Sequence, residues 1–439
     1  MHKILAIVLL LAVAQANAGT DTMALSQQQK DQLDTLRVGA SVIVGGFPDG
    51  FGGTAALRFE RIDVYASGAR VIAVGADGEH ELARSQRVEL IGADAAGDVR
   101  ASLAFDPGFA NVSGVGSGPS GAFVVTATTD ARGVTIHAMP STQALPRGVV
   151  PEIIAGDDAL PSGVAAPDPL TRMLAGAAPA TAPRGATIAI DTDNELMSRR
   201  FANNTTNATN WIADLIGAMN VMYQRDLNVV LQQGTTYLRT APDPYTANDT
   251  PADQADLSEF GTYWEGHYGN VPRSFAALLS GKSSSGNSAS GIAWVNAYCR
   301  TQSNGGSYSV TQVFTNAQIG VGYSALIVGH ELGHNFGAYH THCTNASTGG
   351  APTGTNTIDK CFNTEPGCYT GATSCPTSGP GAPAGTVMSY CNVRQCGPGG
   401  QNVLQFHPTQ ISVLSALIAQ NTPSCLAASS DVIFRNGFD

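Results

Sequence analysis

The sequence predicts an α+β chain in two parts, a mostly β domain followed by a twisted mixed sheet that carries a helix with regularly spaced histidines. Before residue 145, short β-branched segments alternate with Gly, Asp and Asn, as in a small antiparallel sheet. After residue 185 a strand, a long amphipathic helix and a second strand follow one another. Further along, histidines recur at helical spacing after an apolar run. A chain of 439 residues is long enough for two domains.

The composition is that of a loop-rich globular protein. Hydrophobic residues make up 43% of the chain and charged residues only 13%, with 50 glycines, which excludes a disordered protein. The formal net charge of −11 offers no basic surface for nucleic acid or for an anionic membrane. We therefore expect neither of these partners. Separately, we expect a soluble monomer.

Residues 1–18 have the layout of a secretory signal peptide. Lys3 precedes an apolar run over residues 4–13, and Ala16-Asn17-Ala18 follows as a small-residue cleavage site. The apolar run is shorter than the ~20 residues that cross a bilayer, and no later stretch reaches that length. The sequence thus predicts an exported protein, secreted or periplasmic, without a membrane anchor.

All the cysteines lie after residue 298. They are Cys299, Cys343, Cys361, Cys368, Cys375, Cys391, Cys396 and Cys425. An even number confined to one region of an exported chain predicts a disulfide framework for that region. The spacings form no paired C-x-x-C knuckles, which favours disulfides over a structural metal site.

Residues 19–145 are expected to form the mostly antiparallel β domain. A single helix over 26–36 leads it. Six strand-like segments follow, at 40–44, 61–65, 70–74, 87–91, 122–127 and 133–138. The next segment, 146–184, contains seven prolines among Ala and Gly, so we expect an exposed linker without regular structure.

A second domain is expected over residues 185–425, and it begins like a βαβ unit. Residues 187–191 and 227–231 read as strands, and between them apolar residues recur at helical spacing from Trp211 to Tyr223. This order predicts a twisted sheet with helices packed on it.

Later segments complete this second domain. Strands are predicted at 291–295 and 307–314, the latter as an antiparallel edge that could accept an extended peptide. The periodicity of 408–420 predicts a closing helix. Residues 426–439 read as a C-terminal tail.

Residues 330–340 read H-E-x-x-H-x-x-G-x-x-H. On a helix, His330 and His334 point the same way and can bind one metal ion. Gly337 follows the last helical turn, where a left-handed residue lets the chain reverse and return His340 as a third ligand. Three neutral imidazoles leave one open position on a tetrahedral zinc ion, which is the arrangement of a catalytic site.

Glu331 directly follows the first histidine, so its carboxylate can reach a water molecule beside the metal without being a ligand. It is the candidate general base. The alternative is that these are helix-surface histidines at a chance spacing, but the eleven-residue pattern specifies five positions at once.

A downstream segment, residues 386–391, reads Thr-Val-Met-Ser-Tyr-Cys and resembles the Met-turn of the metzincin metallopeptidases. In that clan a methionine after the third histidine forms an apolar floor beneath the zinc ligands, which implies this role for Met388. Tyr390 matches the Met-x-Tyr of the astacin and serralysin branches, where the phenol ligates zinc or binds the developing oxyanion. Tyr390 is therefore a candidate oxyanion stabiliser; the alternative is a rim tyrosine without a role.

Within the clan, residues 185–425 look most like bacterial reprolysin-type enzymes. Residues 220–229 and the Met-Ser-Tyr-Cys sequence carry this likeness. Reprolysins usually place Asp directly after the third histidine, whereas Thr341 stands there in this chain. His342 does not fit the Gly-x-x-His spacing, so His340 is kept as the third ligand.

The resemblance implies a metzincin catalytic domain, one catalytic zinc ion, and hydrolysis of peptide bonds in a protein or peptide substrate. It also implies a disulfide between Cys299 and Cys425, because reprolysins bridge a cysteine ahead of the zinc helix to one at the end of the domain. The other six cysteines allow 15 connectivities. Calcium binding has no support in the sequence.

The position of residues 19–145, ahead of the catalytic domain, is typical of a propeptide. The chain would then be a zymogen activated by cleavage within 146–184. No cysteine precedes Cys299, so latency would need another zinc ligand or steric blockage. Two other interpretations stay open: an inactive zinc-containing binding module on a protease scaffold, or a retained domain at 19–145 that binds carbohydrate or protein and delivers an enzyme.

Overall fold

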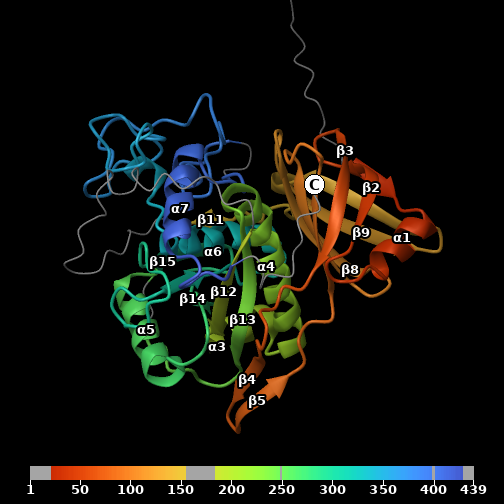
Figure 1. Cartoon of the computed structure of the whole chain (residues 1–439), viewed down its shortest axis with the longest axis horizontal. Helices are drawn as coiled ribbons and strands as arrows, with labels where there is room; N and C mark the ends of the chain where they lie inside the picture. The colour runs from red at the N-terminus through yellow and green to blue at the C-terminus, as the bar shows by residue number, and fades with distance from the viewer. Residues whose placement is uncertain (1–20, 155–182, 248–249, 398–400, 429–439) are drawn as a thin grey trace, which may run out of the picture.

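The computed structural model describes residues 21–154, 183–247, 250–397 and 401–428. These residues form two eight-stranded sheets together with several helices. In Figure 1 the first sheet, in red and orange, lies to the right, and the second sheet lies to the left with most of the helices. The predicted signal peptide at 1–18 lies outside the described residues. No helix within the described ranges is long and apolar enough to cross a membrane.

The first sheet is antiparallel throughout, as predicted, in the order β1-β10-β9-β8-β7-β6-β3-β2. Its strands are β1 (Asp21–Ala24), β2 (Ser41–Pro48), β3 (Thr54–Ile62), β6 (Val88–Ala93), β7 (Arg100–Asp106), β8 (Ala110–Gly118), β9 (Gly121–Asp130) and β10 (Gly133–Pro140). Helix α1 (Gln27–Asp34) begins at a Ser26 capping box and lies within the range predicted to be helical. The rings of Phe59, Phe105 and Phe123 are part of the buried core of this sheet.

Strands β7 and β8 of this sheet have no counterpart among the predicted segments. β8 has glycine at 114, 116 and 118, a composition that reads as a turn. Packing explains Gly116, because a side chain there would collide with the ring of Phe123. Residues 110–118 therefore form a strand because of their packing against Phe123, and the local sequence pattern contains no information about that packing.

The second sheet is mixed, in the order β11-β15-β16-β14-β12-β13-β4-β5. Its strands are β4 (Val71–Gly75), β5 (Gly78–Leu82), β11 (Glu152–Ile153), β12 (Arg184–Thr192), β13 (Val229–Arg239), β14 (Phe275–Ser280), β15 (Ser288–Ala293) and β16 (Tyr308–Gln312). Strands β4, β13, β12, β14 and β16 run parallel, whereas β15 runs antiparallel to β16. The twisted mixed sheet expected from the βαβ order is present.

The prediction that residues 307–314 form an edge strand is wrong. β16 pairs with β14 on one side and with β15 on the other, and all its residues are buried. The alternating pattern arises because Ser309 and Thr311 are buried polar residues inside the sheet. The strand beside the zinc motif is instead β15, and the short β11 pairs with its first two residues at the edge of the sheet.

The N-terminal region contributes strands to the second sheet. β4 pairs in parallel with β13, and β5 folds back on β4 to form the hairpin at the bottom of Figure 1. Strand β11 lies in the segment 146–184, for which no regular structure was expected; residues 155–182 lie outside the described ranges. The boundary expected near residue 145 therefore does not separate two structurally independent units.

The helices are α3 (Asn194–Phe201), α4 (Thr205–Leu227), α5 (Gln254–Tyr268), α6 (Val321–Asn335) and α7 (Pro408–Gln420), with 3₁₀ turns at η1 (Ser141–Gln143) and η2 (Thr341–Cys343). Helix α4 contains the predicted stripe from Trp211 to Tyr223. It contacts β13 and α6 on one side and β6, β7 and β8 of the first sheet on the other, as Figure 1 shows. It therefore joins the two sheets.

The start of the expected tail at 426–439 is part of the fold. Leu426 is fully buried, and the backbone N–H of Ala427 donates to the Gly185 carbonyl at 2.9 Å. Residues 429–439 lie outside the described ranges.

Candidate metal centre

Helix α6 carries the first two histidines of the motif into the core, and its residues from Gly322 to Asn335 are all buried. Its glycines allow close packing. Gly329 lies against Met222 of α4, and a Cβ atom at Gly333 would come within 2.6 Å of the Met388 sulfur. The helix therefore lies directly against α4 and against the Met-turn.

The chain reverses after this helix at Gly337, whose φ of +106° lies in the region that favours glycine. The Gly337 N–H donates to the His334 carbonyl at 2.8 Å, and the Ala338 N–H donates to the Gly333 carbonyl at 2.9 Å. This turn returns His340 to the face of the helix that carries His330 and His334.

The rings of His330, His334 and His340 converge. One nitrogen from each ring lies within 4.8 Å of the others. The Nε2 atoms of His330 and His334 are 3.0 Å apart. The structure therefore brings the three predicted ligands together at one point in the core.

In each of these rings the other nitrogen, Nδ1, donates to an oxygen. The acceptors are the Val387 carbonyl for His330 (2.8 Å), the Ala338 carbonyl for His334 (2.9 Å) and the Glu365 carboxylate for His340 (2.8 Å). Because these oxygens accept a hydrogen bond, each Nδ1 carries the proton and each Nε2 keeps its lone pair. This is the tautomer that binds a metal through Nε2.

Burial lowers the pKa of the three imidazoles, to about 3 for His330 and His334 and to about 4 for His340. A neighbouring imidazole lowers the pKa of His330 and His334 further. All three rings are therefore neutral at pH 7, which is the form that ligates metals. A set of three neutral nitrogen donors fits a catalytic zinc ion.

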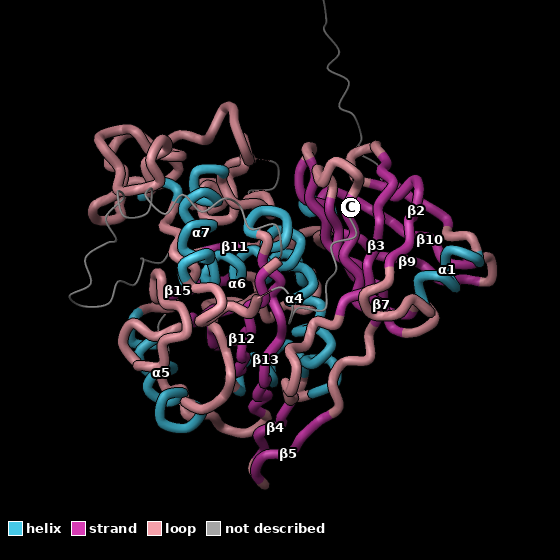
Figure 2. Tube along the Cα trace, viewed as in Figure 1, coloured by secondary structure: helices cyan, strands magenta, loops and turns pink. Residues whose placement is uncertain are grey.

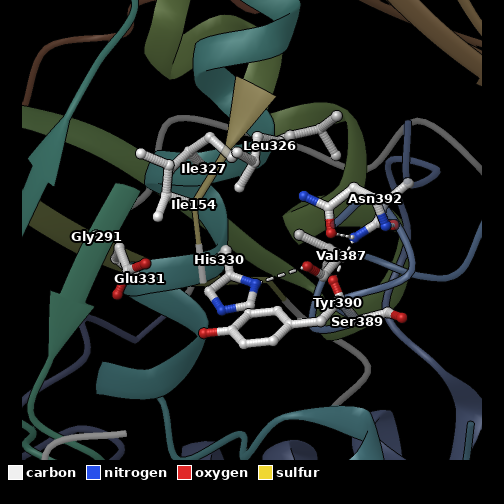
Figure 3. Close-up of a pocket in the computed structure, with 12 residues that line it drawn as sticks. Ile154, Gly291, Leu326, Ile327, His330, Glu331, Val387, Ser389, Tyr390 and Asn392 are labelled. Atoms are coloured by element: carbon white, nitrogen blue, oxygen red, sulfur yellow. Dashed lines mark hydrogen bonds between the residues drawn. The ribbon is translucent and has the colours of Figure 1, made fainter. Parts of the chain in front are cut away.

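Glu331 lies beside the first histidine and packs against β15. Its carboxyl group touches Gly291 of β15 so closely that a Cβ atom at position 291 would collide with it. Figure 3 shows Gly291 and Glu331 together beside the His330 ring. Burial raises the pKa of Glu331 well above its usual range, and a divalent cation at the imidazoles would oppose this rise. Gly291 was not predicted, and a glycine inside a strand was the only available sign.

The Met-turn lies against the histidines. Met388 is fully buried next to Gly333, and its neighbour Val387 supplies the acceptor for His330. The ring centroid of Tyr390 is 4.2 Å from that of His340 and 6.0 Å from that of His330. In Figure 3 the phenol lies beside the His330 ring, with its hydroxyl on the side of Glu331.

Residues 182–403 match the model of the Reprolysin_5 family, described as Metallo-peptidase family M12, and this match covers half of the chain. The chain belongs to metallopeptidase family M12. The reprolysin-type resemblance is thereby confirmed. The family implies a zinc-dependent peptidase with a catalytic zinc ion and protein substrates, in agreement with the three converging imidazoles. No curated protein matched the chain in a sequence comparison.

The cleft of this M12 domain is bordered by β15, α6 and the Met-turn. Residues that line it include Gly291, His330, Glu331 and Tyr390. Ile153 and Ile154, from the N-terminal side, line it too. They are held by β11, where the Glu152 N–H donates to Asn287 (2.8 Å) and the Ile154 N–H donates to Ala289 (2.9 Å), both at backbone carbonyls.

The eight cysteines of the chain form four disulfides. Cys299 is bonded to Cys425, the pairing that the resemblance implies. The other bridges are Cys343–Cys368, Cys361–Cys391 and Cys375–Cys396. They staple residues 343–396, which we call the stapled loop. Figure 2 shows this part mostly as loop, at the upper left.

Two buried acidic residues of the stapled loop were not predicted, and one of them, Glu365, contacts a ligand histidine. Glu365 accepts from His340 and also from Nε2 of His342 at 2.8 Å. Asp359 accepts hydrogen bonds from the hydroxyls of Thr341 and Ser389. The loop has no periodicity, so only the cysteines around these acids indicated that it would be ordered.

Proposed function

We propose that the chain is an exported zinc endopeptidase, made as a zymogen, with a metzincin catalytic domain over residues 185–425. His330, His334 and His340 hold the zinc ion, and Glu331 is the general base. The observation that carries the proposal is the convergence of three neutral imidazoles, each oriented through Nδ1, beside a buried carboxyl group. The predicted signal peptide at 1–18 and the four disulfides support export.

A bound zinc ion would supply Lewis acidity to the scissile carbonyl and to the attacking water. Glu331 takes one proton from that water and later returns it to the leaving amine. The carboxylate is positioned for this because Gly291 leaves space for it on the wall of the cleft. The apolar side chains of Leu326 and Ile327 line the same pocket and would exclude bulk water from the reacting atoms.

Tyr390 is proposed to donate its hydroxyl to the oxyanion that develops on the substrate carbonyl. Its position over His340 and beside His330 supports this role. Replacing Tyr390 by Phe should lower kcat about tenfold to a hundredfold while zinc content stays constant. An unchanged kcat would leave Tyr390 as a tyrosine of the cleft rim.

Residues 19–145 are proposed to be a propeptide, and cleavage within 146–184 is proposed to activate the enzyme. The support is the position of Ile153 and Ile154 in the cleft beside His330 and Glu331. This segment occupies the edge of β15, where an extended substrate would add as a strand. Latency would then be steric, because these residues cover the edge of the cleft; a cysteine plug is excluded, since no cysteine precedes Cys299.

The deciding experiment replaces Glu331 by Gln and measures zinc content and peptide cleavage in the processed enzyme. We expect one zinc ion per chain and a loss of cleavage by several orders of magnitude, about 10³-fold or more. Glu265→Gln, at an exposed position of α5, is the matched control and should change neither quantity.

Cleavage by Glu331→Gln at the wild-type rate would remove Glu331 from the mechanism. A processed wild-type chain that binds zinc and cleaves no peptide would instead identify an inactive zinc-containing binding module.

A further inference from the structure

The third zinc ligand differs from the other two in what holds it. Nδ1 of His330 and Nδ1 of His334 donate to backbone carbonyls, those of Val387 and Ala338. Nδ1 of His340 donates to a side chain, the carboxylate of Glu365. Nδ1 of His340 is therefore held by a charged side chain that can be replaced, whereas the Nδ1 bonds of the other two ligands go to the backbone.

The Glu365 carboxylate is almost completely enclosed. Its side chain is 6% exposed, and the side chains of His340 and His342 are 1% and 0% exposed. The same oxygen, Oε2, accepts from Nδ1 of His340 and from Nε2 of His342, each at 2.8 Å. A buried carboxylate is stable only where hydrogen-bond donors compensate its charge. The two histidines provide these donors for Glu365.

The two histidines hold the carboxylate in one geometry. Their rings are nearly parallel, with an interplanar angle of 8° and centroids 5.3 Å apart. Both rings donate to the same carboxylate oxygen. The hydrogen bond from His342 therefore helps to hold that oxygen within reach of His340. His342, which the zinc motif leaves unexplained, thereby gains a function as the second anchor of Glu365.

The stapled loop brings Glu365 to this place. Cys343, which follows His342, is bonded to Cys368, three residues beyond Glu365. The Tyr369 N–H also donates to the His342 carbonyl at 3.1 Å. The loop is thus tied to the segment around His342 by two contacts that directly follow Glu365 in the sequence.

A second acid in the loop has similar burial but does not touch a zinc ligand. Asp359 accepts from the hydroxyls of Thr341 and Ser389, and from the backbone N–H of Cys361 at 3.0 Å. It joins the loop to the residue after His340 and to the Met-turn. It is therefore a matched comparison for Glu365, because it shares the loop and the burial without the ligand contact.

We propose that Glu365 is a positioning residue of the zinc site, which orients the His340 ring, keeps its proton on Nδ1 and so raises the zinc affinity of its Nε2. A carboxylate in this place makes the imidazole a stronger ligand than a carbonyl does, and loss of such a partner costs about tenfold to a hundredfold in metal affinity. The inference rests on the proposed zinc site, but it concerns affinity and ligand geometry rather than the reaction.

The test compares Glu365→Gln with Asp359→Asn in the full-length chain carrying Glu331→Gln, so that self-cleavage does not interfere. Zinc affinity is measured by competition with a chromophoric chelator, and the visible spectrum of bound Co²⁺ reports ligand geometry. We expect Glu365→Gln to weaken zinc binding about tenfold to a hundredfold and to shift the Co²⁺ spectrum. Asp359→Asn should retain the parental spectrum and an affinity within about threefold of it.

Parental affinity and spectrum for Glu365→Gln would overturn the proposal. Equal losses in the two variants would also overturn it, because they would indicate a general effect of the loop. If the parent chain itself binds no zinc, the proposed function fails instead, so the two failures are distinguishable.

If Glu365→Gln does not fold, the proposal can still be tested by a measurement on the parent chain, in which Glu365 and the three histidines are unchanged. Nitrogen-15 NMR of the zinc-loaded parent chain should show His340 with a protonated Nδ1 and a metal-bound Nε2. Its Nδ1 proton should resonate further downfield than those of His330 and His334, because its acceptor is charged. Three equivalent Nδ1 protons would contradict the role of Glu365.

Discussion

The two edges of the second sheet are both covered by N-terminal strands, but in different ways. At the far edge, β4 pairs with β13 from Val71–Thr236 to Val74–Arg239 and is itself covered by β5. At the edge beside the zinc motif, β11 pairs with β15 through only two residues, Glu152 and Ile153. At the far edge, four residue pairs join β4 to β13 and the side chains of β4 are partly buried in the core. At the cleft edge, only two residue pairs join β11 to β15.

This difference distinguishes a strand contact that stabilises the fold from one that is proposed to block the cleft. Val71 and Ile72 of β4 are buried against the second sheet, so the hairpin belongs to its core. Ile153 is only half-buried and reaches the cleft. We therefore expect changes at the far edge to alter the free energy of unfolding, and changes at the cleft edge to alter access to the metal centre.

The largest expected effect is at the far edge. Val71→Asp places an unpaired charge in the core and should lower the free energy of unfolding of the uncut chain by about 4 kcal/mol. Urea denaturation in the Glu331→Gln background measures it. Ile43→Asp, at a position of the first sheet that is 61% exposed, is the control and should cost less than about 0.5 kcal/mol. If both substitutions lower the free energy of unfolding equally, β4 contributes no more to stability than an exposed strand does.

The next effect is on the strand that forms the cleft edge. Gly291→Ala introduces a methyl group where the Glu331 carboxyl now lies, and the displaced carboxyl should lower kcat of the processed enzyme about 100-fold with zinc content unchanged. Gly286→Ala is the control, because its Cβ would come no closer than 3.4 Å to Thr315 and Asn316, its nearest neighbours in space. A normal kcat for Gly291→Ala would show that the position of Glu331 is not critical.

Access through the cleft edge should respond to β11. Ile153→Asp removes an apolar contact from this bridge and should raise the activity of the uncut chain on a short fluorogenic peptide about tenfold. Val150→Asp, only three residues away and 65% exposed, should leave that activity unchanged. Gel electrophoresis must show that both chains stay intact. If neither variant is activated, β11 does not block the cleft.

The smallest effect concerns the contact between the first sheet and α4. Burial, and then the nearby Asp214, raise the pKa of Glu89 well above its usual range. The folded chain therefore keeps a proton that the unfolded chain loses above about pH 4.3, and the contribution of Glu89 to stability falls as the pH rises towards its folded pKa. Arg87, which donates to Asp214 at 2.8 Å, opposes this rise in the pKa of Glu89.

Glu89→Gln should remove this pH dependence. Relative to the parent chain, the variant should gain about 1 kcal/mol of unfolding free energy between about pH 5 and about pH 8. Urea titrations at both pH values measure the gain. A difference between variant and parent that does not change with pH would show that Glu89 does not titrate in this range.

Much of the site could be predicted because its information is local. His330, His334, Gly337 and His340 lie within one helix and one turn, so their spacing alone specifies their geometry. Met388 and Tyr390 followed from a resemblance; Met388 packs against Gly333 of α6, and the ring centroid of Tyr390 lies 4.2 Å from that of His340.

The remaining features depend on contacts between distant segments. Glu365 is 25 residues from His340 in a loop without periodicity, and only the folded disulfides bring the two together. The β4–β5 hairpin reads as part of the first sheet until its pairing with β13 is known. Because Ser309 and Thr311 are buried polar residues, the internal strand β16 shows the alternation of polar and apolar residues that is typical of an edge strand. Local patterns report burial and period, but not which partner a strand or a carboxylate will meet.

The most direct test of the account is an anomalous difference map of the crystallised Glu331→Gln chain, collected on both sides of the zinc absorption edge. We predict one peak, about 2.0–2.1 Å from the Nε2 atoms of His330, His334 and His340. In the same crystal, Nδ1 of His340 should donate a hydrogen bond to the Glu365 carboxylate. A zinc-loaded crystal with no peak between these three rings, or with the ion bound elsewhere, would contradict the assignment of this site.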